Sequence, residues 1–529
     1  MTLCLAAWLR WHDAGESLWL DELHTAWCAE GTLADVAPRA ALGNQSPLYF
    51  YAEWCLTSLF GQSELSLRLM SLLCGIALPA AIYFMTRAWT AAAESETSAI
   101  CGLVAAALAT VDPLSIFYAQ EARPYAAVQL LAVGHLFLLT EWLREQKLWQ
   151  RIAWILSGVL LFYLHYTTAL VFVPEAVFLS GYFCFHRSTK RPLAVLWLIN
   201  FALLALLCLP ALSQLRDIAS RRENWDAFIQ PQPAVTILTV FPWSIASLYL
   251  AVAFLTNPTR QRGSSSLALR VSDETSLALR VGDEASLARL VSDETSLTRS
   301  VRYVVLLLCW LFIPVTLAWL ATEAGVARLF LPRYLIASLA PSYIVAALCV
   351  PLMPTRSGRI LFALALVGTA IFTSGIVQQL RHDGRVHGQR REDWRGAVTF
   401  LNFQLEHRPL PVLVRSGLIE ADAVQMQNNP QLRDYCLYPV TSLYRLNVPR
   451  EVLIPLPTVA AGQLSPEVKR LVQARGGTWL LLRANEASAR RIERECIQSL
   501  SDRDTRAAVI HRQAFGNLWV VQVSAAPLP

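Results

Sequence analysis

Charged residues are scarce in this sequence. Asp, Glu, Lys and Arg make up 16% of the 529 residues, whereas an ordinary soluble domain carries roughly 25%. The hydrophobic set makes up 55%, and the mean hydropathy is +0.40. This composition excludes a disordered chain, a collagen-like chain and a small disulfide scaffold. It also disfavours a wholly soluble protein, so we expect a membrane domain together with one soluble domain.

Metal-ligand motifs and a cleavable leader are also missing. None of the 11 cysteines stands in a C-x-x-C motif or at Cys/His ligand spacing, so a zinc site has little support. In the C-terminal region, Cys436 and Cys496 could form a disulfide, although two separate buried thiols are the simpler expectation. Residues 1–9 are apolar but have no basic flank and no A-x-A site. We interpret them as a first membrane helix that is short or is cut off by the start of the sequence, rather than as a signal peptide.

Long apolar segments dominate the chain as far as Leu380. Most of them approach the roughly 20 residues that cross a bilayer as a helix. No soluble core could bury so many, so we predict an α-helical polytopic membrane protein with about 10–11 transmembrane helices. The predicted spans are 68–88, 99–117, 124–143, 152–164, 167–185, 193–213, 236–255, 303–321, 333–353 and 360–380.

The distribution of Lys and Arg between alternate loops predicts the topology. The loops at 144–151, 187–191, 260–302 and 356–359 are basic, which places them in the cytoplasm. Residues 10–67 and the region after 380 then lie on the opposite side. Within the third basic loop, residues 264–300 include a near-perfect ten-residue repeat beginning SLALRVSDET. This segment is too polar to form a core, and we expect a dispensable cytoplasmic insert.

Residues 381–529 change character and predict an extracytoplasmic α/β domain. Helical patterns cover 393–406, 465–475 and 487–499, and apolar strand patterns cover 411–415 and 478–483. Gly516-Asn517 separates two further strand patterns, at 509–515 and 518–523, which is typical of a β-hairpin. The chain is therefore divided into a membrane domain, residues 1–380, and this C-terminal domain, residues 381–529.

Two polar clusters in the outer loops are candidates for chemistry. Ser17-Leu18-Trp19-Leu20-Asp21-Glu22 places two adjacent carboxylates beside the first apolar segment. A solvated helix cap with an interfacial tryptophan is the alternative interpretation. Tyr118-Ala119-Gln120-Glu121-Ala122-Arg123-Pro124-Tyr125 joins two spans. Its carboxylate, guanidinium and tyrosines could hold a phosphate or a sugar, or could form a local ion pair in an interfacial turn.

Taken in order, these clusters resemble a known family. SLWLDE, SPLYFY with FGQSELSLRL, FYAQEARPY, Leu331-Pro332-Arg333-Tyr334 and REDWRG at 391–396 resemble polyprenyl-phosphate-sugar-dependent glycosyltransferases of the GT-C superfamily. The nearest branch is related to dolichyl-phosphate-mannose–protein mannosyltransferases and includes bacterial lipid A aminoarabinose and lipopolysaccharide-core transferases. The resemblance extends over residues 17–400. The short first helix, Ser46-Pro47 and the repeat depart from the family pattern.

The resemblance implies an inverting transfer of a hexosyl or pentosyl group from a polyprenyl phosphate to a hydroxyl acceptor. Asp21 matches the family's catalytic aspartate, Glu22 is the second choice for the base, and Glu121 would orient substrate or a divalent metal. Arginines suit the leaving phosphate through their fork of N–H groups, and the candidates are Arg123, Arg333 and Arg68. Arg333 could instead be an interfacial snorkelling residue, and His165 a capped interfacial histidine. The further candidates for substrate contact are Tyr118, Gln120, Tyr125, His165 and Tyr334.

Two other classes of function compete with this hypothesis. A transporter or flippase for lipid-linked sugars would place ionisable residues within the spans, whereas a non-catalytic sensor would not need two acidic clusters. The expected partners are the lipid-linked sugar donor, a lipid, glycan or protein acceptor, and the bilayer, with no nucleic acid. The expected location is the plasma (inner) membrane, with the active site outside the cytoplasm. The sequence leaves open the sugar, the lipid, the acceptor, the metal and the oligomeric state.

Overall fold

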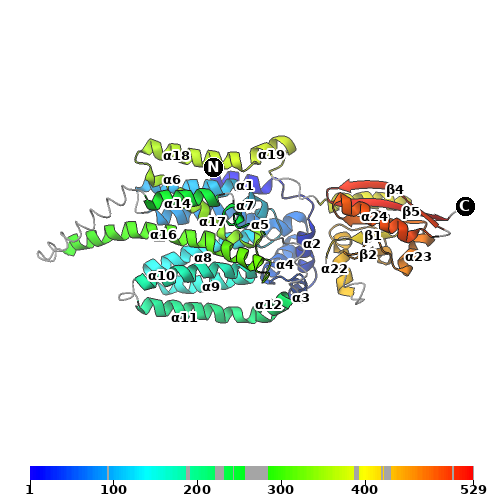
Figure 1. Ribbon diagram of the computed structural model, residues 1–529, viewed down its shortest axis with the longest axis horizontal. Coiled ribbons are helices and arrows are strands. Elements are labelled where there is room, and N and C mark those ends of the chain that lie inside the picture. The colour runs from blue at the N-terminus through cyan, green and yellow to red at the C-terminus, as the bar shows by residue number, and fades with distance from the viewer. Residues whose placement is uncertain are drawn as a thin grey trace. The chain divides into compact units, whose positions relative to one another are not determined.

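The chain forms two compact units. A computed structural model describes residues 1–91, 94–185, 191–220, 232–241, 243–256, 284–386, 392–418, 421, 430–502 and 505–527 (Figure 1). The helical unit consists of residues 1–12, 44–49 and 70–386, and the sheet unit of 13–43, 50–69 and 387–529. Of the predicted insert, residues 264–283 lie outside the described residues, and residues 284–300 begin a long helix.

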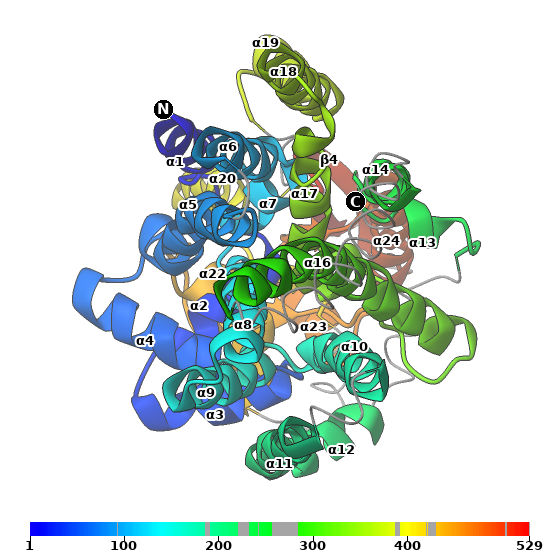
Figure 2. The ribbon, with the colours of Figure 1, turned by 90° about the vertical axis from the view of Figure 1, so that its left-hand side faces the viewer.

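Helices account for the regular structure of the helical unit. Several are short, because prolines or 3-10 turns interrupt the apolar segments. Figure 2 shows the helices nearly end-on. The helices are α1 (Thr2–Trp11), α5 (Glu64–Trp89, which begins in the sheet unit), α6 (Ser95–Val111), α7 (Pro113–Ala119), α8 (Tyr125–Glu145), α9 (Leu148–Leu164), α10 (Phe172–Phe185), α11 (Arg191–Cys208), α12 (Leu212–Ser220), α13 (Thr236–Thr239), α14 (Ser244–Thr256), α16 (Glu284–Glu323), α17 (Ala340–Ala347), α18 (Arg356–Thr373) and α19 (Ile376–Asp383).

The predicted helical membrane architecture is confirmed, but the number of long spans is smaller than predicted. Among the described residues, six helices are long and apolar enough to cross a membrane, or seven if α6 and α7, bent by 63°, form one span. The predicted span 333–353 is broken into η4 (Pro332–Tyr334), η5 (Ile336–Ser338), α17 and η6 (Val350–Leu352). Pro332, Pro341 and Pro351 occupy first-turn positions of these elements, where proline starts a helix and stops the preceding one.

A polar pair lies inside the helical unit, where α8, α9 and α10 pack around Trp142 and Trp154. His135 Nε2 on α8 lies 3.1 Å from Glu175 Oε1 on α10, and both side chains are fully buried. His135 Nδ1 lies 2.7 Å from the Ser157 hydroxyl on α9. The Trp154 ring stacks on His135 with a centroid distance of 5.3 Å. The pair therefore joins three neighbouring helices (Figure 2).

Ser157 provides a polar partner for the other side of the His135 ring. Ser157 donates its one hydroxyl proton to the Trp154 carbonyl at 2.9 Å, so its oxygen accepts from His135 Nδ1–H. The imidazole and the carboxylate lie side by side, which lowers the cost of burying either polar group in a low-dielectric interior.

The sheet unit contains a five-stranded sheet, with order β2-β1-β3-β5-β4. Strands β1, β2 and β3 are parallel, whereas β5 pairs antiparallel with β3 and with β4. The elements are α2 (Leu20–Ala29), α3 (Leu33–Leu42), α4 (Leu48–Phe60), α20 (Trp394–His407), β1 (Val412–Arg415), α22 (Pro430–Thr441), η7 (Arg450–Val452), β2 (Leu453–Pro455), α23 (Pro466–Ala474), β3 (Gly477–Arg483), α24 (Glu486–Leu500), β4 (Thr505–Phe515) and β5 (Leu518–Pro527).

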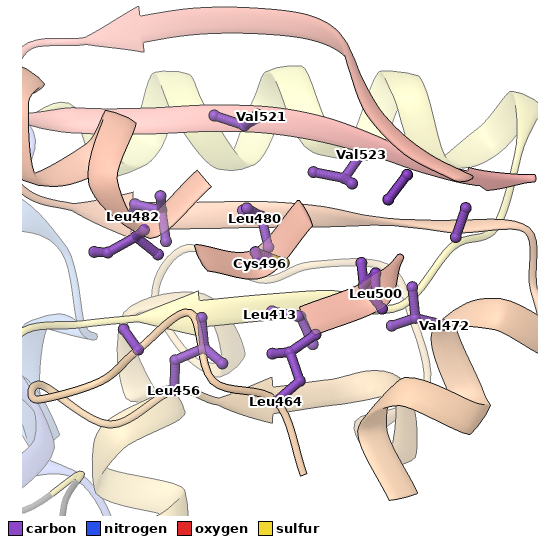
Figure 3. Close-up of a cluster of buried hydrophobic side chains, with 14 of the residues drawn as sticks. Leu413, Leu456, Leu464, Val472, Leu480, Leu482, Cys496, Leu500, Val521 and Val523 are labelled. Atoms are coloured by element: carbon purple, nitrogen blue, oxygen red, sulfur yellow. The ribbon is translucent and has the colours of Figure 1, made fainter. Parts of the chain in front are cut away.

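Helices cover both faces of this sheet, because alternate residues of a strand point to opposite faces. On one face Leu480 and Leu482 of β3 pack with Cys496 of α24 in an apolar core (Figure 3). On the other face Trp479 meets Phe400 of α20 edge-on, with ring centroids 6.1 Å apart. Cys496 is a free, buried thiol, which agrees with separate thiols and not with the Cys436–Cys496 disulfide.

The α/β pattern predicted from the sequence is confirmed element by element. The helices expected at 393–406, 465–475 and 487–499 are α20, α23 and α24. The strands expected at 411–415 and 478–483 are β1 and β3, and the hairpin turns at Gly516 with φ of 68°. The sequence patterns missed β2, which has three residues, and α22, which contains Pro439.

The buried pair of the helical unit yields a stability prediction. Glu175→Ala leaves His135 Nε2 without its partner, so we expect a loss of about 1–3 kcal/mol of stability. Glu175→Gln keeps a polar group beside Nε2 and should lose less stability. The measurement is the thermal unfolding midpoint in detergent. Glu96→Gln, in an exposed pair with Arg356, is the control; an equal effect of all three changes would contradict a special role for the buried pair.

Candidate active site

The first acidic cluster forms the start of helix α2. Asp21 and Glu22 lie in its first turn, where carboxylates interact favourably with the positive end of the helix dipole. Glu22 Oε2 also accepts the backbone N–H of Trp19 at 3.3 Å. Glu22 therefore caps the helix, as the alternative interpretation expected, but it is buried and not solvated.

Glu22 and Arg68 form a fully buried ion pair. Arg68, on the first part of α5, donates its Nε–H to Glu22 Oε1 at 2.7 Å and its Nη2–H to Oε2 at 2.6 Å. This bidentate geometry is the strongest that arginine and carboxylate adopt. The remaining N–H groups of Arg68 donate to the carbonyls of Ala14 and Glu16 at 2.7 Å, and of Ser17 at 3.4 Å.

This pair separates the roles of the neighbouring carboxylates. All five N–H groups of Arg68 are engaged by the chain itself, so the structure favours a scaffold role for it over phosphate binding. Both Glu22 oxygens are likewise used by Arg68. Asp21, one residue earlier, is only partly buried, so the two adjacent carboxylates differ in exposure.

The second cluster lies in the helical unit, in the turn between α7 and α8. Asp112 caps α7 by accepting the Ser115 N–H at 2.8 Å. The turn is tight, with the Arg123 N–H donating to the Glu121 carbonyl at 2.7 Å. Ser71 donates to the Arg123 carbonyl at 2.8 Å. Glu121 and Arg123 are both buried, so this turn holds a carboxylate and a guanidinium within a protein environment rather than in open solvent.

Aromatic rings from three separate segments meet beside this turn. The ring centroids of Tyr118 and Tyr125 are 5.0 Å apart, and those of Tyr125 and His165 are 5.7 Å apart. His165 in turn contacts Tyr334 at 5.4 Å, and the Arg333 guanidinium lies 5.2 Å from the Tyr334 ring. The outer-loop candidates of the helical unit are thus brought together although they come from distant parts of the sequence.

His165 lies in the positive field of this cluster. Burial, and then the charges of Arg123 and Arg333, lower the pKa of His165 to about 3. The imidazole is therefore neutral at physiological pH. Thr167 fixes it by a hydrogen bond of 2.7 Å to Nδ1. His165 therefore adds no charge of its own to a cluster on which Arg123, Arg333 and the carboxylate of Glu121 act.

The structure thus groups most of the predicted residues. Asp21, Glu22 and Arg68 belong to the sheet unit, whereas the remaining candidates belong to the helical unit. Gln120 differs from its neighbours, because its side-chain amide donates to the Leu9 carbonyl at 3.1 Å and holds α1. In the described part of the chain, no group of three or more His, Cys, Asp or Glu side chains could hold a metal ion.

Sequence reasoning missed two kinds of residue. His135 and Glu175 were visible as ionisable residues inside predicted spans, which is a recognised signal. Glu392 stood in the REDWRG motif without a role, and Tyr444 had no signal at all. Glu392 accepts the Leu20 N–H at 3.1 Å and Tyr444 accepts the Leu18 N–H at 2.8 Å, so both act on the segment that carries Asp21.

Fold and sequence together define a polytopic helical membrane protein that also carries an α/β domain. Residues 44–213 match the family described as dolichyl-phosphate-mannose-protein mannosyltransferase. The resemblance to the GT-C superfamily stated from the sequence is confirmed by this match, which supports a membrane glycosyltransferase. No curated protein matches the chain.

Several solved structures are similar to the chain at low identity. ArnT from Cupriavidus metallidurans in the apo state is 11% identical, covering 98% of this chain and 96% of that chain with a TM-score of 0.42. The same protein bound to undecaprenyl phosphate is 12% identical, with 98% and 97% coverage and a TM-score of 0.42. The Archaeoglobus fulgidus oligosaccharyltransferase with Zn and sulfate is 14% identical, with 86% and 62% coverage and a TM-score of 0.43.

The Glu22–Arg68 pair yields a second stability prediction. Arg68→Ala leaves a buried carboxylate without its cation, which typically costs about 3–5 kcal/mol. We expect a marked fall in the unfolding midpoint in detergent. Arg491→Ala is the control, because Arg491 is exposed and lies 3.8 Å from Glu495 on a helix surface, where such pairs contribute about 0.3–0.5 kcal/mol. Similar midpoints for the two variants would refute the scaffold role.

Proposed function

We propose that this protein transfers a sugar from a polyprenyl-phosphate donor to a hydroxyl acceptor, with inversion, at the extracytoplasmic face of the plasma membrane. The observation that carries the proposal is the difference between two adjacent carboxylates at the start of α2. Glu22 is buried in an ion pair with Arg68, and Asp21 beside it is partly exposed. The family match over residues 44–213 supports the class of donor, since the family is described by a dolichyl-phosphate-linked mannose. The basic loops of the other face support the orientation.

In the proposed reaction Asp21 is the general base. Its carboxylate takes the proton of the acceptor hydroxyl as the oxygen attacks the anomeric carbon. The bond from that carbon to the phosphate oxygen breaks, and the lipid phosphate leaves with the electron pair. Attack from the side opposite the phosphate inverts the anomeric centre. Glu121 would orient the sugar, and no step is derived through a metal.

The arginine cluster would bind the leaving phosphate. Arg123 and Arg333 both lower the pKa of His165, so both guanidinium groups are close to one neutral ring. Negative charge builds up on the phosphate as the bond breaks, and preorganised cations stabilise that change. Tyr118, Tyr125 and Tyr334 supply aromatic surface on which a sugar ring could pack.

One observation favours a second function, a transporter of lipid-linked sugars. The buried pair of His135 and Glu175 lies within predicted spans, where transporters place their ionisable groups. Loss of sugar transfer on changing Asp21 alone supports the enzyme. Loss of lipid-linked-sugar movement in vesicles by Glu175→Gln, with Asp21→Asn unaffected, would support the transporter.

The first functional prediction concerns Asp21. Asp21→Asn keeps the size of the side chain but removes the base, and general-base catalysis contributes about 10²–10⁴-fold. We expect transfer to fall by about that factor with an unchanged unfolding midpoint. The assay follows label from a panel of polyprenyl-phosphate sugars into lipid, glycan and protein acceptors supplied by membranes. Glu30→Gln, at the other end of α2, is the control; near-normal transfer by Asp21→Asn would rule out this base.

The second functional prediction concerns the donor phosphate. Arg123→Ala and Arg333→Ala each remove charged hydrogen bonds, worth about 1.5–3 kcal/mol. Binding of a labelled polyprenyl phosphate should therefore weaken by roughly 10- to 150-fold. Lysine at either position should restore only part, because it lacks the fork. The exposed Arg216 serves as control through Arg216→Ala. Unchanged lipid-phosphate binding in both alanine variants would move the phosphate site elsewhere.

A further inference from the structure

The segment that carries Asp21 is held by residues from the far end of the chain. Leu18 and Tyr444 are 426 positions apart, and Leu20 and Glu392 are 372 apart, yet in each case a backbone N–H of the first partner donates to a side-chain oxygen of the second. All four residues belong to the sheet unit. These contacts fall immediately before Asp21, on the last residues outside α2 and the first residue inside it.

Glu392 ties this segment to the sheet. Its Oε1 accepts Arg483 Nε–H at 2.6 Å, at the end of the central strand β3. Its Oε2 accepts both the Leu20 N–H and the Trp394 indole N–H, each at 3.1 Å. The backbone of Glu392 is itself bridged to Gly516 in the turn of the β4–β5 hairpin. One buried carboxylate therefore connects the start of α2, the start of α20 and the sheet.

Tyr444 provides a second hold. Burial raises the pKa of Tyr444 to about 12, so its hydroxyl stays protonated. The hydroxyl donates to Glu64 Oε1 at 3.0 Å and accepts the Leu18 N–H at 2.8 Å. Glu64 also accepts Arg395 Nη2–H at 2.6 Å, and the same Arg395 nitrogen donates to the Gly15 carbonyl at 2.8 Å. Residues 15, 18 and 20 are thus each fixed by a named contact.

We propose that the C-terminal α/β domain positions the catalytic base: Glu392 and Tyr444 hold the backbone amides of Leu20 and Leu18 so that Asp21 keeps its place for proton transfer. The proposal rests on the proposed role of Asp21. Glu392 and Tyr444 are positioning residues, since they act through the backbone. Residues 13–19 form a connecting segment without helix or strand. Such a segment must be fixed by contacts with other parts of the fold, because misplacing a catalytic group by about 1 Å lowers the rate of reaction on the order of 10²-fold.

The chain offers closely matched controls for both residues. Glu493 is as buried as Glu392, at 7% exposure, and accepts an arginine Nε–H at 2.9 Å from Arg512. It lies on α24, and its bond to Arg512 does not involve α2. Tyr438 carries a buried hydroxyl that accepts a hydrogen bond from Gln62 at 3.1 Å. Glu493→Gln therefore matches Glu392→Gln, and Tyr438→Phe matches Tyr444→Phe, in the side-chain change and in the weakening of a buried hydrogen bond. Neither control residue bonds to the backbone amides of residues 18 and 20.

The experiment compares Glu392→Gln and Tyr444→Phe with these controls in the full-length protein. We expect kcat for sugar transfer to fall by about 10- to 100-fold, while binding of labelled polyprenyl phosphate and the unfolding midpoint stay within the range of the controls. Hydrogen exchange of the backbone amides of residues 18–23 should become faster, and exchange in β3 should not. Equal falls in kcat for the test and control variants would overturn the proposal, as would unchanged exchange at residues 18–23.

The exchange measurement separates failure of this inference from failure of the proposed function. One outcome is faster exchange at residues 18–23 in Glu392→Gln combined with full activity of Asp21→Asn. This result would show that Glu392 fixes the segment but that Asp21 is not the base, so the positioning of a base would be refuted. Inactive Asp21→Asn combined with fully active Glu392→Gln and Tyr444→Phe would keep the base and refute its positioning by the C-terminal domain.

Discussion

The buried pair of Glu22 and Arg68 is the interaction on which the arrangement of the candidate base depends. A buried carboxylate is tolerated only with a cation and filled hydrogen bonds, and Arg68 supplies both while also gathering the carbonyls of Ala14, Glu16 and Ser17. The neighbouring Asp21 keeps a partly exposed side chain. Two adjacent acids of similar chemistry therefore have different surroundings, because one is buried against arginine and the other is partly exposed.

The same constraint recurs in the helical unit with a different solution. His135 and Glu175 are fully buried with 3.1 Å between Nε2 and Oε1, and the Ser157 hydroxyl lies 2.7 Å from Nδ1, so each polar side chain has a polar neighbour that lowers the cost of its burial. Arg123 and Arg333, by contrast, lie beside a histidine that burial and their own field keep uncharged. The cluster of rings thus also contains the charges of Arg123 and Arg333, in contrast to the apolar surroundings of His135 and Glu175.

Much of the fold could be predicted from the sequence, because its signals are local. Apolar segments long enough to cross a bilayer predict membrane helices, and alternating patterns with Gly516-Asn517 predict the hairpin. The exceptions also have local causes. Pro341 and Pro351 break the segment at 333–353, Pro332 directly precedes it, and β2 is too short to show a pattern. An apolar segment that contains proline can form one kinked helix or several short helices. The outcome depends on whether the backbone carbonyls left without a donor by proline find other partners in the fold. A hydropathy pattern carries no information about those partners.

The sequence by itself determined the class of the protein, the presence of an α/β domain and the loop segments that hold the candidate residues. Composition and periodicity suffice for these, since they depend on neighbours within one element. Only the tertiary structure decided which partner each of the candidate residues has. Arg68, a candidate for phosphate binding, forms its ion pair with Glu22, and Gln120 donates a hydrogen bond to Leu9 of α1. Tyr444 and Glu392 reach Leu18 and Leu20 from the far end of the chain. Such assignments follow from the competition of buried polar groups for partners, and that competition is settled only when distant segments pack together.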